Sequence, residues 1–382
     1  MPSSLPVPSF FDRDRVGDVW RVPYTQLAIE AQQWSRQHQI RPASTDRPRI
    51  ALLMIDVQNT FCTPDFELFV GGRSGRGAVD DSCRLCEFIY RNLPYLTELI
   101  PTLDTHGAMQ IFHPIFWVDS QGNHPEPLTN ITWEDVQQGR WRPNPNLAAT
   151  MTDRSLKNAW FDTVSEHNSL GEIRAGVEHQ DQESNCDRES SLDLPNYALH
   201  YTKTLHDLAK YPLTIWPYHS ILGGIGHAMV SAVEAACFFH AIARHAPTRF
   251  ELKGGHPLTE NYSILQPEVL TDQQQQAIAQ KNTALIDRLL TFDAVLIAGQ
   301  AKSHCVAWTI ADLLAEIQTH RPSFAKHVYL LEDCMSPVVV PGIVDFTEMA
   351  NETFQKFAEA GLNLVRSTEP IEHWPGFASL VA

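Results

Sequence analysis

The chain has 382 residues, enough to bury a large core in one elaborated domain or in two. Its formal net charge of −16 argues against a nucleic-acid-binding or anionic-membrane-binding surface. Seven cysteines, no 18-residue apolar run and no signal-peptide pattern lead us to expect a cytoplasmic protein with free thiols and no membrane span.

The first part of the chain contains one clear strand signal. Residues 1–47 are rich in Pro, Ser and Arg, and we expect an N-terminal extension with one helix at about 24–38. The apolar run that ends in Asp56 predicts a buried strand, and open α/β sheets place their sites at such carboxyl ends. A helical pattern covers 79–103, and residues 108–118 predict the next strand.

The remaining pattern predicts a long insertion inside an α/β domain. Residues from about 119 to 211 are polar and weakly periodic, and we interpret them as the insertion. Strands alternating with helices favour a three-layer αβα domain over 48–368 with a central, mostly parallel sheet, followed by a C-terminal tail at 369–382. The expected elements after the insertion cover 229–245, 250–253, 271–290, 294–298, 328–333, 347–360 and 362–365.

The sequence around Cys305 joins a buried strand to the start of a helix. The apolar run 294–298 ends in glycine, and after a tight turn Cys305 opens a helical pattern. Unpaired backbone N–H groups at a helix N-terminus stabilise a thiolate and can hold an oxyanion. From this segment alone, Cys305 is either a nucleophile or a buried structural cysteine.

Two further residues extend this site. Asp56 and Lys253 also lie at or near the ends of predicted strands. A carboxylate can take the proton of a thiol, and an ammonium group stabilises the resulting negative charge. Asp56, Lys253 and Cys305 therefore form a candidate nucleophilic set at one edge of the sheet.

This set resembles that of the isochorismatase-like cysteine hydrolases, and among them the nicotinamidases. The resemblance implies that Asp56 is the general base, Lys253 the electrostatic support and Cys305 the nucleophile. It also implies a non-proline cis peptide at Gln300–Ala301 and an oxyanion hole made by the backbone N–H groups of Ala301 and Cys305. The matching segments, in the family's order of acid, lysine and cysteine, are 54–61, 253–254 and 301–306.

A second set of residues resembles the metal ligands of nicotinamidases. Asp104 and His106 are similar to the family's Asp-x-His pair, and His219 ends a Trp-Pro-x-His segment at 216–219. The likeness implies a divalent metal, with Zn²⁺ as the first candidate and Mn²⁺ or Fe²⁺ as alternatives, that polarises or orients the substrate. The chain has 17 histidines, so an Asp-x-His pair alone is a weak signal.

The implied reaction is hydrolysis of a small amide through a thioester, with nicotinamide as the first candidate substrate. Alternatives are a carbamoyl, ureido or maleamate-type amide, or a non-catalytic binding or assembly protein on the same fold. Phe61 and Gln300 are candidate pocket residues, whereas we expect His113 to be a satisfied structural histidine and assign no site role to Glu260. The resemblance also implies a homo-oligomer.

Overall fold

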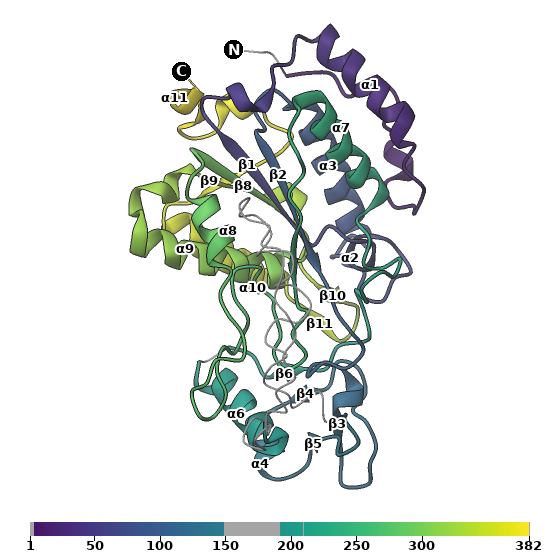
Figure 1. Cartoon of the computed structure of the whole chain (residues 1–382), viewed down its shortest axis with the longest axis vertical. Coiled ribbons are helices and arrows are strands. Elements are labelled where there is room, and N and C mark those ends of the chain that lie inside the picture. The colour runs from purple at the N-terminus through teal and green to yellow at the C-terminus, as the bar shows by residue number, and fades with distance from the viewer. Residues whose placement is uncertain (1–3, 149–191, 209, 382) are drawn as a thin grey trace, which may run out of the picture.

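A six-stranded parallel sheet forms the centre of the molecule, which is described here by a computed structural model (Figure 1). The structure describes residues 4–148, 192–208 and 210–381. The strand order is β12–β9–β8–β1–β2–β7. From β1 the chain therefore adds β2 and β7 on one side and then β8, β9 and β12 on the other. The strands are β1 (Ile50–Ile55), β2 (Glu98–Asp104), β7 (Glu251–Lys253), β8 (Ala294–Gly299), β9 (Val328–Leu331) and β12 (Asn363–Val365).

Helices cover both faces of this sheet. All six residues of β1 are buried, and alternate side chains pack into two different cores. Leu52 and Met54 pack with α3 and α7, whereas Leu53 and Ile55 pack with α8, α9 and α10. The helices of the first layer are α3 (Gly77–Arg91) and α7 (Ser231–Arg244), and those of the second are α8 (Thr283–Leu289), α9 (Ala307–His320) and α10 (Thr347–Glu359). This arrangement confirms the expected three-layer αβα fold.

The segments outside 48–368 pack against the domain. Helix α1 (Tyr24–Gln37) agrees with the helix expected in the N-terminal extension and contacts α7. At the other end, α11 (Phe377–Val381) follows Trp374, whose ring stacks on Phe88 of α3. No helix among the described residues is long and apolar enough to cross a membrane.

A smaller lobe lies beyond the carboxyl edge of the sheet (Figure 1). It has its own apolar cluster, which includes Phe116, Trp117 and Tyr201. Of the expected insertion, residues 149–191 and 209 lie outside the described residues. The elements of the lobe are β3 (Trp117–Val118), β4 (Asn130–Ile131), α4 (Trp133–Gln137), β5 (Arg142–Pro143), α6 (Leu194–Asp207) and β6 (Leu213–Thr214).

The helix expected over 79–103 is wrong in its second half. Helix α3 ends at Arg91, and residues from Glu98 form strand β2. Pro94 and Pro101 explain the break, because each would remove a hydrogen bond from a continuous helix and clash with the preceding turn. The apolar residues at the end of the pattern are buried in the sheet instead.

Two other expected elements are also wrong. Residues 108–116 form a loop with a 3₁₀ turn at Pro114–Phe116, and only Trp117–Val118 form a strand, the short β3. The side chains of Ile111, Phe112, Phe116 and Trp117 lie in the core of the smaller lobe. The helix expected over 271–290 begins only at Thr283, where the side chain of Asn282 accepts the N–H of Leu285. Before it, residues from Thr271 fold into a turn held by the carboxylate of Asp272.

Candidate active site and metal centre

Four adjacent strands deliver the predicted site residues to one edge of the sheet. Asp56 follows β1, Asp104 ends β2 and Lys253 ends β7, while the turn after β8 leads to Cys305. The register pairs Asp104 with Lys253 directly. Because parallel strands end at the same edge, residues about 250 positions apart in sequence meet here.

The ammonium group of Lys253 lies at the centre of the predicted triad. Its Nζ is 3.0 Å from Oδ2 of Asp56 and 3.6 Å from Sγ of Cys305. It also donates hydrogen bonds to Oδ1 of Asp104 at 2.8 Å and to the carbonyl of Asn261 at 2.9 Å. All five residues except Asn261 are buried, so these charges interact with little screening by water.

The orientation of Asp56 depends on Thr102 of β2. The Thr102 hydroxyl donates to Oδ1 of Asp56 at 2.6 Å and accepts the backbone N–H of Asp56 at 3.0 Å. Asp56 itself has a positive φ of 49°, which turns the chain out of the strand. The second oxygen, Oδ2, is thereby left for Lys253 and Cys305.

Burial and charge set the protonation of the triad. Burial raises the pKa of Asp56 above its usual value, with Lys253 acting in the opposite direction. Burial also raises the pKa of the Cys305 thiol, although Lys253 favours the thiolate. For Lys253, burial opposes the charge, but Asp104 and Asp56 raise its pKa well above the ordinary value. These directions favour a neutral thiol and a charged lysine, and they make the carboxylate of Asp56 more basic than an exposed aspartate.

The turn that carries Cys305 has the backbone expected for it. The Gln300–Ala301 peptide is cis, and residues Lys302–Val306 form one π-helical turn before α9. The carbonyl of Ala301 accepts the N–H groups of His304 and Val306, while the N–H of Ala301 has no partner among the described residues. That free N–H is available to an oxyanion.

Of the two candidate pocket residues, Phe61 lines the cavity at the site and Gln300 does not. The amide of Gln300 donates to Oδ2 of Asp81 at 2.8 Å and accepts the N–H of Ser336 at 3.2 Å. Gln300 is therefore held by α3 behind the turn, a contact between distant segments that sequence alone does not reveal.

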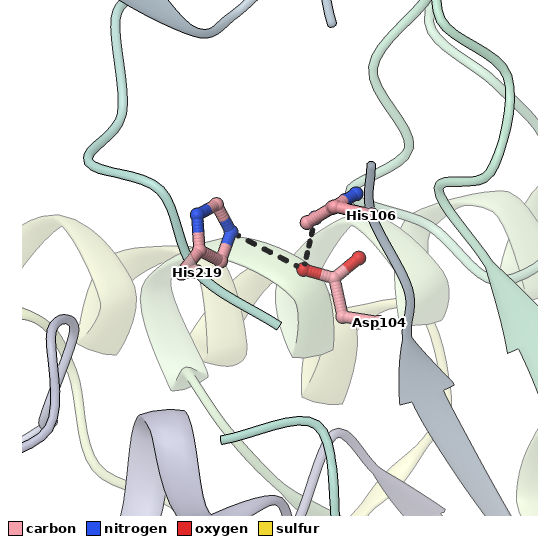
Figure 2. Close-up of side chains that lie close together, drawn as sticks. All are labelled: Asp104, His106 and His219. Atoms are coloured by element: carbon pink, nitrogen blue, oxygen red, sulfur yellow. Dashed lines mark hydrogen bonds and ion pairs between the residues drawn. The ribbon is translucent and has the colours of Figure 1, made fainter. Parts of the chain in front are cut away.

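The predicted metal ligands also come together (Figure 2). Asp104, His106 and His219 are all buried, and one donor atom of each lies within 4.8 Å of the others. Oδ2 of Asp104 is 2.8 Å from Nε2 of His106 and 3.5 Å from Nε2 of His219. The carboxylate and both imidazole rings thus converge on one point.

Hydrogen bonds behind the two rings make this group suitable for a cation. Nδ1 of His106 faces the carbonyl of Gly254 at 3.0 Å, and Nδ1 of His219 faces that of Pro217 at 2.8 Å. A carbonyl only accepts, so each Nδ1 carries a proton, and in the neutral form of each ring the lone pair of Nε2 faces the carboxylate. Burial lowers the pKa of His219, which favours its neutral form. Three acceptors that face one another fit a divalent metal.

A cavity of about 350 Å³ connects the triad to the metal group. It is lined by Cys305 and Lys253, by Asp104, His106 and His219, and by many apolar side chains. Its volume falls within the range of small-molecule sites, about 300–1,000 Å³. The apolar wall includes Phe61, Phe66, Phe69, Phe112, Leu128 and Val338.

Sequence reasoning missed three residues beside this cavity. Thr102 orients Asp56, as described above. Glu260 is buried, accepts the indole N–H of Trp216 at 2.8 Å, and has a pKa raised to about 8 by burial and by Glu268. Nδ1 of His113 meets a carbonyl as expected, but its buried Nε2 has no partner among the described residues. The contacts of Thr102 and Glu260 join distant segments, and only the distance of seven residues from Lys253 to Glu260 indicated that Glu260 lies near the site.

Comparisons with known proteins find structures similar to this chain but no similar sequence. No family model matches the chain, and no curated protein matches it in sequence. A nicotinamidase/pyrazinamidase of Acinetobacter baumannii is 16% identical, with 85% of this chain and 99% of that chain covered and a TM-score of 0.45. A pyrazinamidase of Pyrococcus horikoshii in complex with zinc is 16% identical, with 84% and 99% covered and a TM-score of 0.40.

An N-carbamoylsarcosine amidase from Thermoplasma acidophilum is 13% identical, with 84% of this chain and 98% of that chain covered and a TM-score of 0.38. Identities and scores this low do not define an activity, so the function must be inferred from the residues of the site. The chain is similar along most of its length to solved structures named as amidases.

Proposed function

We propose that this protein is a cysteine amidohydrolase that cleaves a small carboxamide, with nicotinamide as the first candidate. The observation that carries the proposal is the position of Lys253 Nζ, 3.0 Å from Asp56 Oδ2 and 3.6 Å from Cys305 Sγ, at the wall of a cavity. An acid, an amine and a thiol buried together in this way are suited to forming and stabilising a thiolate.

In the first half of the reaction, the carboxylate of Asp56 takes the proton of Cys305. The thiolate sulfur then bonds to the amide carbonyl carbon, and the oxyanion that forms accepts the N–H groups of Ala301 and Cys305. Lys253 stabilises the negative charge throughout. When the carbon–nitrogen bond breaks, the nitrogen receives the proton held by Asp56 and leaves as ammonia, and a thioester on Cys305 remains.

In the second half, Asp56 takes a proton from water, whose oxygen attacks the thioester. The carbon–sulfur bond breaks, the carboxylic acid leaves, and the proton on Asp56 returns to the sulfur of Cys305. Asp104, His106 and His219 would hold a divalent metal, for which Zn²⁺ is the first candidate. Such an ion supplies Lewis-acid polarisation and orientation of a substrate.

The test is release of ammonia from a panel of amides by Zn²⁺-supplemented protein. The panel contains nicotinamide, benzamide, maleamate and an N-carbamoyl amino acid, and the comparison variant is Asp56→Asn, which keeps the shape of the side chain and removes the base. We expect release from nicotinamide with wild type and a loss of about 10²-fold or more in the variant. If ammonia is released only from another amide of the panel, that amide replaces nicotinamide as the proposed substrate. If ammonia is released from none of them, the proposed activity is contradicted.

A further inference from the structure

His304, the residue before the nucleophile, forms part of the cavity wall. Its ring lies among three aromatic side chains, with centroid distances of 6.0 Å to Trp216, 5.7 Å to Tyr262 and 5.0 Å to Phe346. This packing fixes the ring next to Cys305. A polar ring in such a position is available to a bound substrate.

The hydroxyl of Ser303 determines which nitrogen of His304 carries the proton. Ser303 Oγ accepts the backbone N–H of Val338 at 3.0 Å and lies 2.8 Å from Nδ1 of His304. Among the described residues Nδ1 is the only hydrogen-bond acceptor within reach of the Ser303 hydroxyl hydrogen. We therefore assign this hydrogen to Nδ1, so that Nδ1 accepts and Nε2 carries the proton of the neutral ring. Nε2 has no hydrogen-bond partner within the described ranges. Burial lowers the pKa of His304 to about 4, which keeps the ring neutral near pH 7.

The other polar groups on this wall are largely occupied. The indole N–H of Trp216 donates to Glu260 at 2.8 Å and to the hydroxyl of Tyr262 at 3.0 Å. The ammonium group of Lys253 is shared among the contacts described above. The side-chain amide of Asn261 and Oε2 of Glu260 are further polar groups of the lining without a hydrogen-bond partner, as far as the structure describes it. His304 therefore supplies a free, neutral N–H donor beside Cys305.

The charges of the lining favour an uncharged substrate. Among the described residues that line the cavity, Lys253 is the only lysine or arginine, and its charge is balanced by Asp56 and Asp104. No lysine or arginine side chain of the lining is therefore left free to pair with a substrate carboxylate, of the kind found in maleamate. A neutral donor suits a ring nitrogen or another uncharged acceptor.

We propose that His304 is a specificity-determining residue, whose Nε2–H donates to an uncharged acceptor atom on the acyl part of a neutral aromatic carboxamide. This inference rests on the proposed amide hydrolysis for its substrate class. His304 takes part in substrate binding only, and no covalent bond forms or breaks at its side chain.

The test compares His304→Phe, which keeps an aromatic ring without the donor, with His304→Gln, which keeps an N–H donor. The substrates are benzamide, with no ring acceptor, nicotinamide, with one, and pyrazinecarboxamide, with two. For each protein we take the ratio of kcat/KM for the better of the two acceptor-bearing amides to kcat/KM for benzamide. We expect this ratio to be about 3- to 10-fold lower in His304→Phe than in wild type, the effect of losing one hydrogen bond. His304→Gln should retain most of the wild-type ratio. An equal loss for all three amides, or the same loss in both variants, overturns the proposal.

A binding experiment separates this proposal from the proposed activity. The three amides are titrated by calorimetry into Zn²⁺-supplemented Cys305→Ala protein, with and without His304→Phe. We expect His304→Phe to weaken binding of an acceptor-bearing amide about 3- to 10-fold and to leave benzamide unchanged. This result supports the role of His304 even if no amide is turned over. Equal weakening of all three, no weakening, or no binding of any of them overturns it.

Discussion

Asp104 joins the triad to the metal group. One oxygen, Oδ1, accepts a hydrogen bond from Lys253 Nζ at 2.8 Å, and the other, Oδ2, lies 2.8 Å from Nε2 of His106. Burial alone would raise the pKa of Asp104, but His106 and Lys253 lower it well below the usual value, so the carboxylate stays ionised. A single side chain therefore contributes to the charge of the lysine and to the donor set for the metal.

Replacing this carboxylate tests both roles together. Asp104→Asn should weaken Zn²⁺ binding by more than about 100-fold, measured with a competing chelator, because a charged ligand is lost. It should also lower the melting temperature, because Lys253 loses one of two buried carboxylate partners. Asp312→Asn, on α9 and outside the cavity lining, is the control. Unchanged Zn²⁺ affinity in Asp104→Asn would show that the three residues do not form the metal site.

Thr102 gives a prediction about pH dependence. Its hydroxyl hydrogen bond lowers the pKa of Asp56, against the larger effect of burial. Thr102→Val should therefore raise that pKa, and since Asp56 acts when ionised, the acid limb of kcat/KM should move up by about one pH unit. Thr102→Ser keeps the hydroxyl and should keep the wild-type profile. A profile unchanged in Thr102→Val would mean that the acid limb does not report Asp56.

Gly254 supports the metal group through its backbone. It has a positive φ of 83°, and a Cβ there would lie 2.5 Å from Cε1 of His106 and 2.9 Å from Oδ1 of Asp104. Gly254→Ala should reduce both stability and Zn²⁺ affinity. Gly223→Ala is a matched control, since φ is 81° but no atom lies within 4 Å of the added Cβ. It should cost about 1 kcal/mol in stability and leave Zn²⁺ affinity unchanged. Equal effects of the two substitutions on Zn²⁺ binding would exclude the predicted clash.

Glu260 predicts a pH dependence of stability. Its pKa is about 8 in the folded protein and near 4.5 without burial, so between these values the folded state holds a proton that the unfolded state has lost. The free energy of unfolding should fall as the pH rises from about 4.5 to 8, and reach its lower plateau above 8. Glu260→Gln cannot ionise, so its melting temperature should fall less than that of wild type over this interval. Exposed Glu359→Gln is the control. Parallel curves for wild type and Glu260→Gln would mean that Glu260 is ionised throughout.

Residues at the ends of uninterrupted apolar runs could be predicted from sequence. Asp56 and Cys305 follow such runs, and the fully buried strands β1 and β8 occur where these were expected. Strand β2 could not be located, because the spacing of Leu96 and Leu99 also fits a helix; the signal against it was the pair of flanking prolines. Asp104 was nevertheless identified, since the Asp-x-His pattern does not depend on the element that carries it.

Residues whose roles depend on contacts between distant segments could not be predicted. Gln300 was expected in the pocket, but Asp81 of α3 holds its amide behind the turn. Thr102 matters because its hydroxyl makes two hydrogen bonds to Asp56, and Ser303 matters because its hydroxyl contacts Nδ1 of His304. No local pattern distinguishes these hydroxyl groups from the many other Ser and Thr residues of the chain.

The central claim is that Cys305 is the nucleophile of an amidase. The most direct test is ammonia release from nicotinamide by Zn²⁺-supplemented Cys305→Ala, measured beside wild type and beside Cys83→Ala, which removes a thiol from α3. We predict that wild type and Cys83→Ala release ammonia at similar rates and that Cys305→Ala, with an unchanged melting profile, releases none above the uncatalysed background. Release by Cys305→Ala at a rate comparable to wild type would contradict the claim.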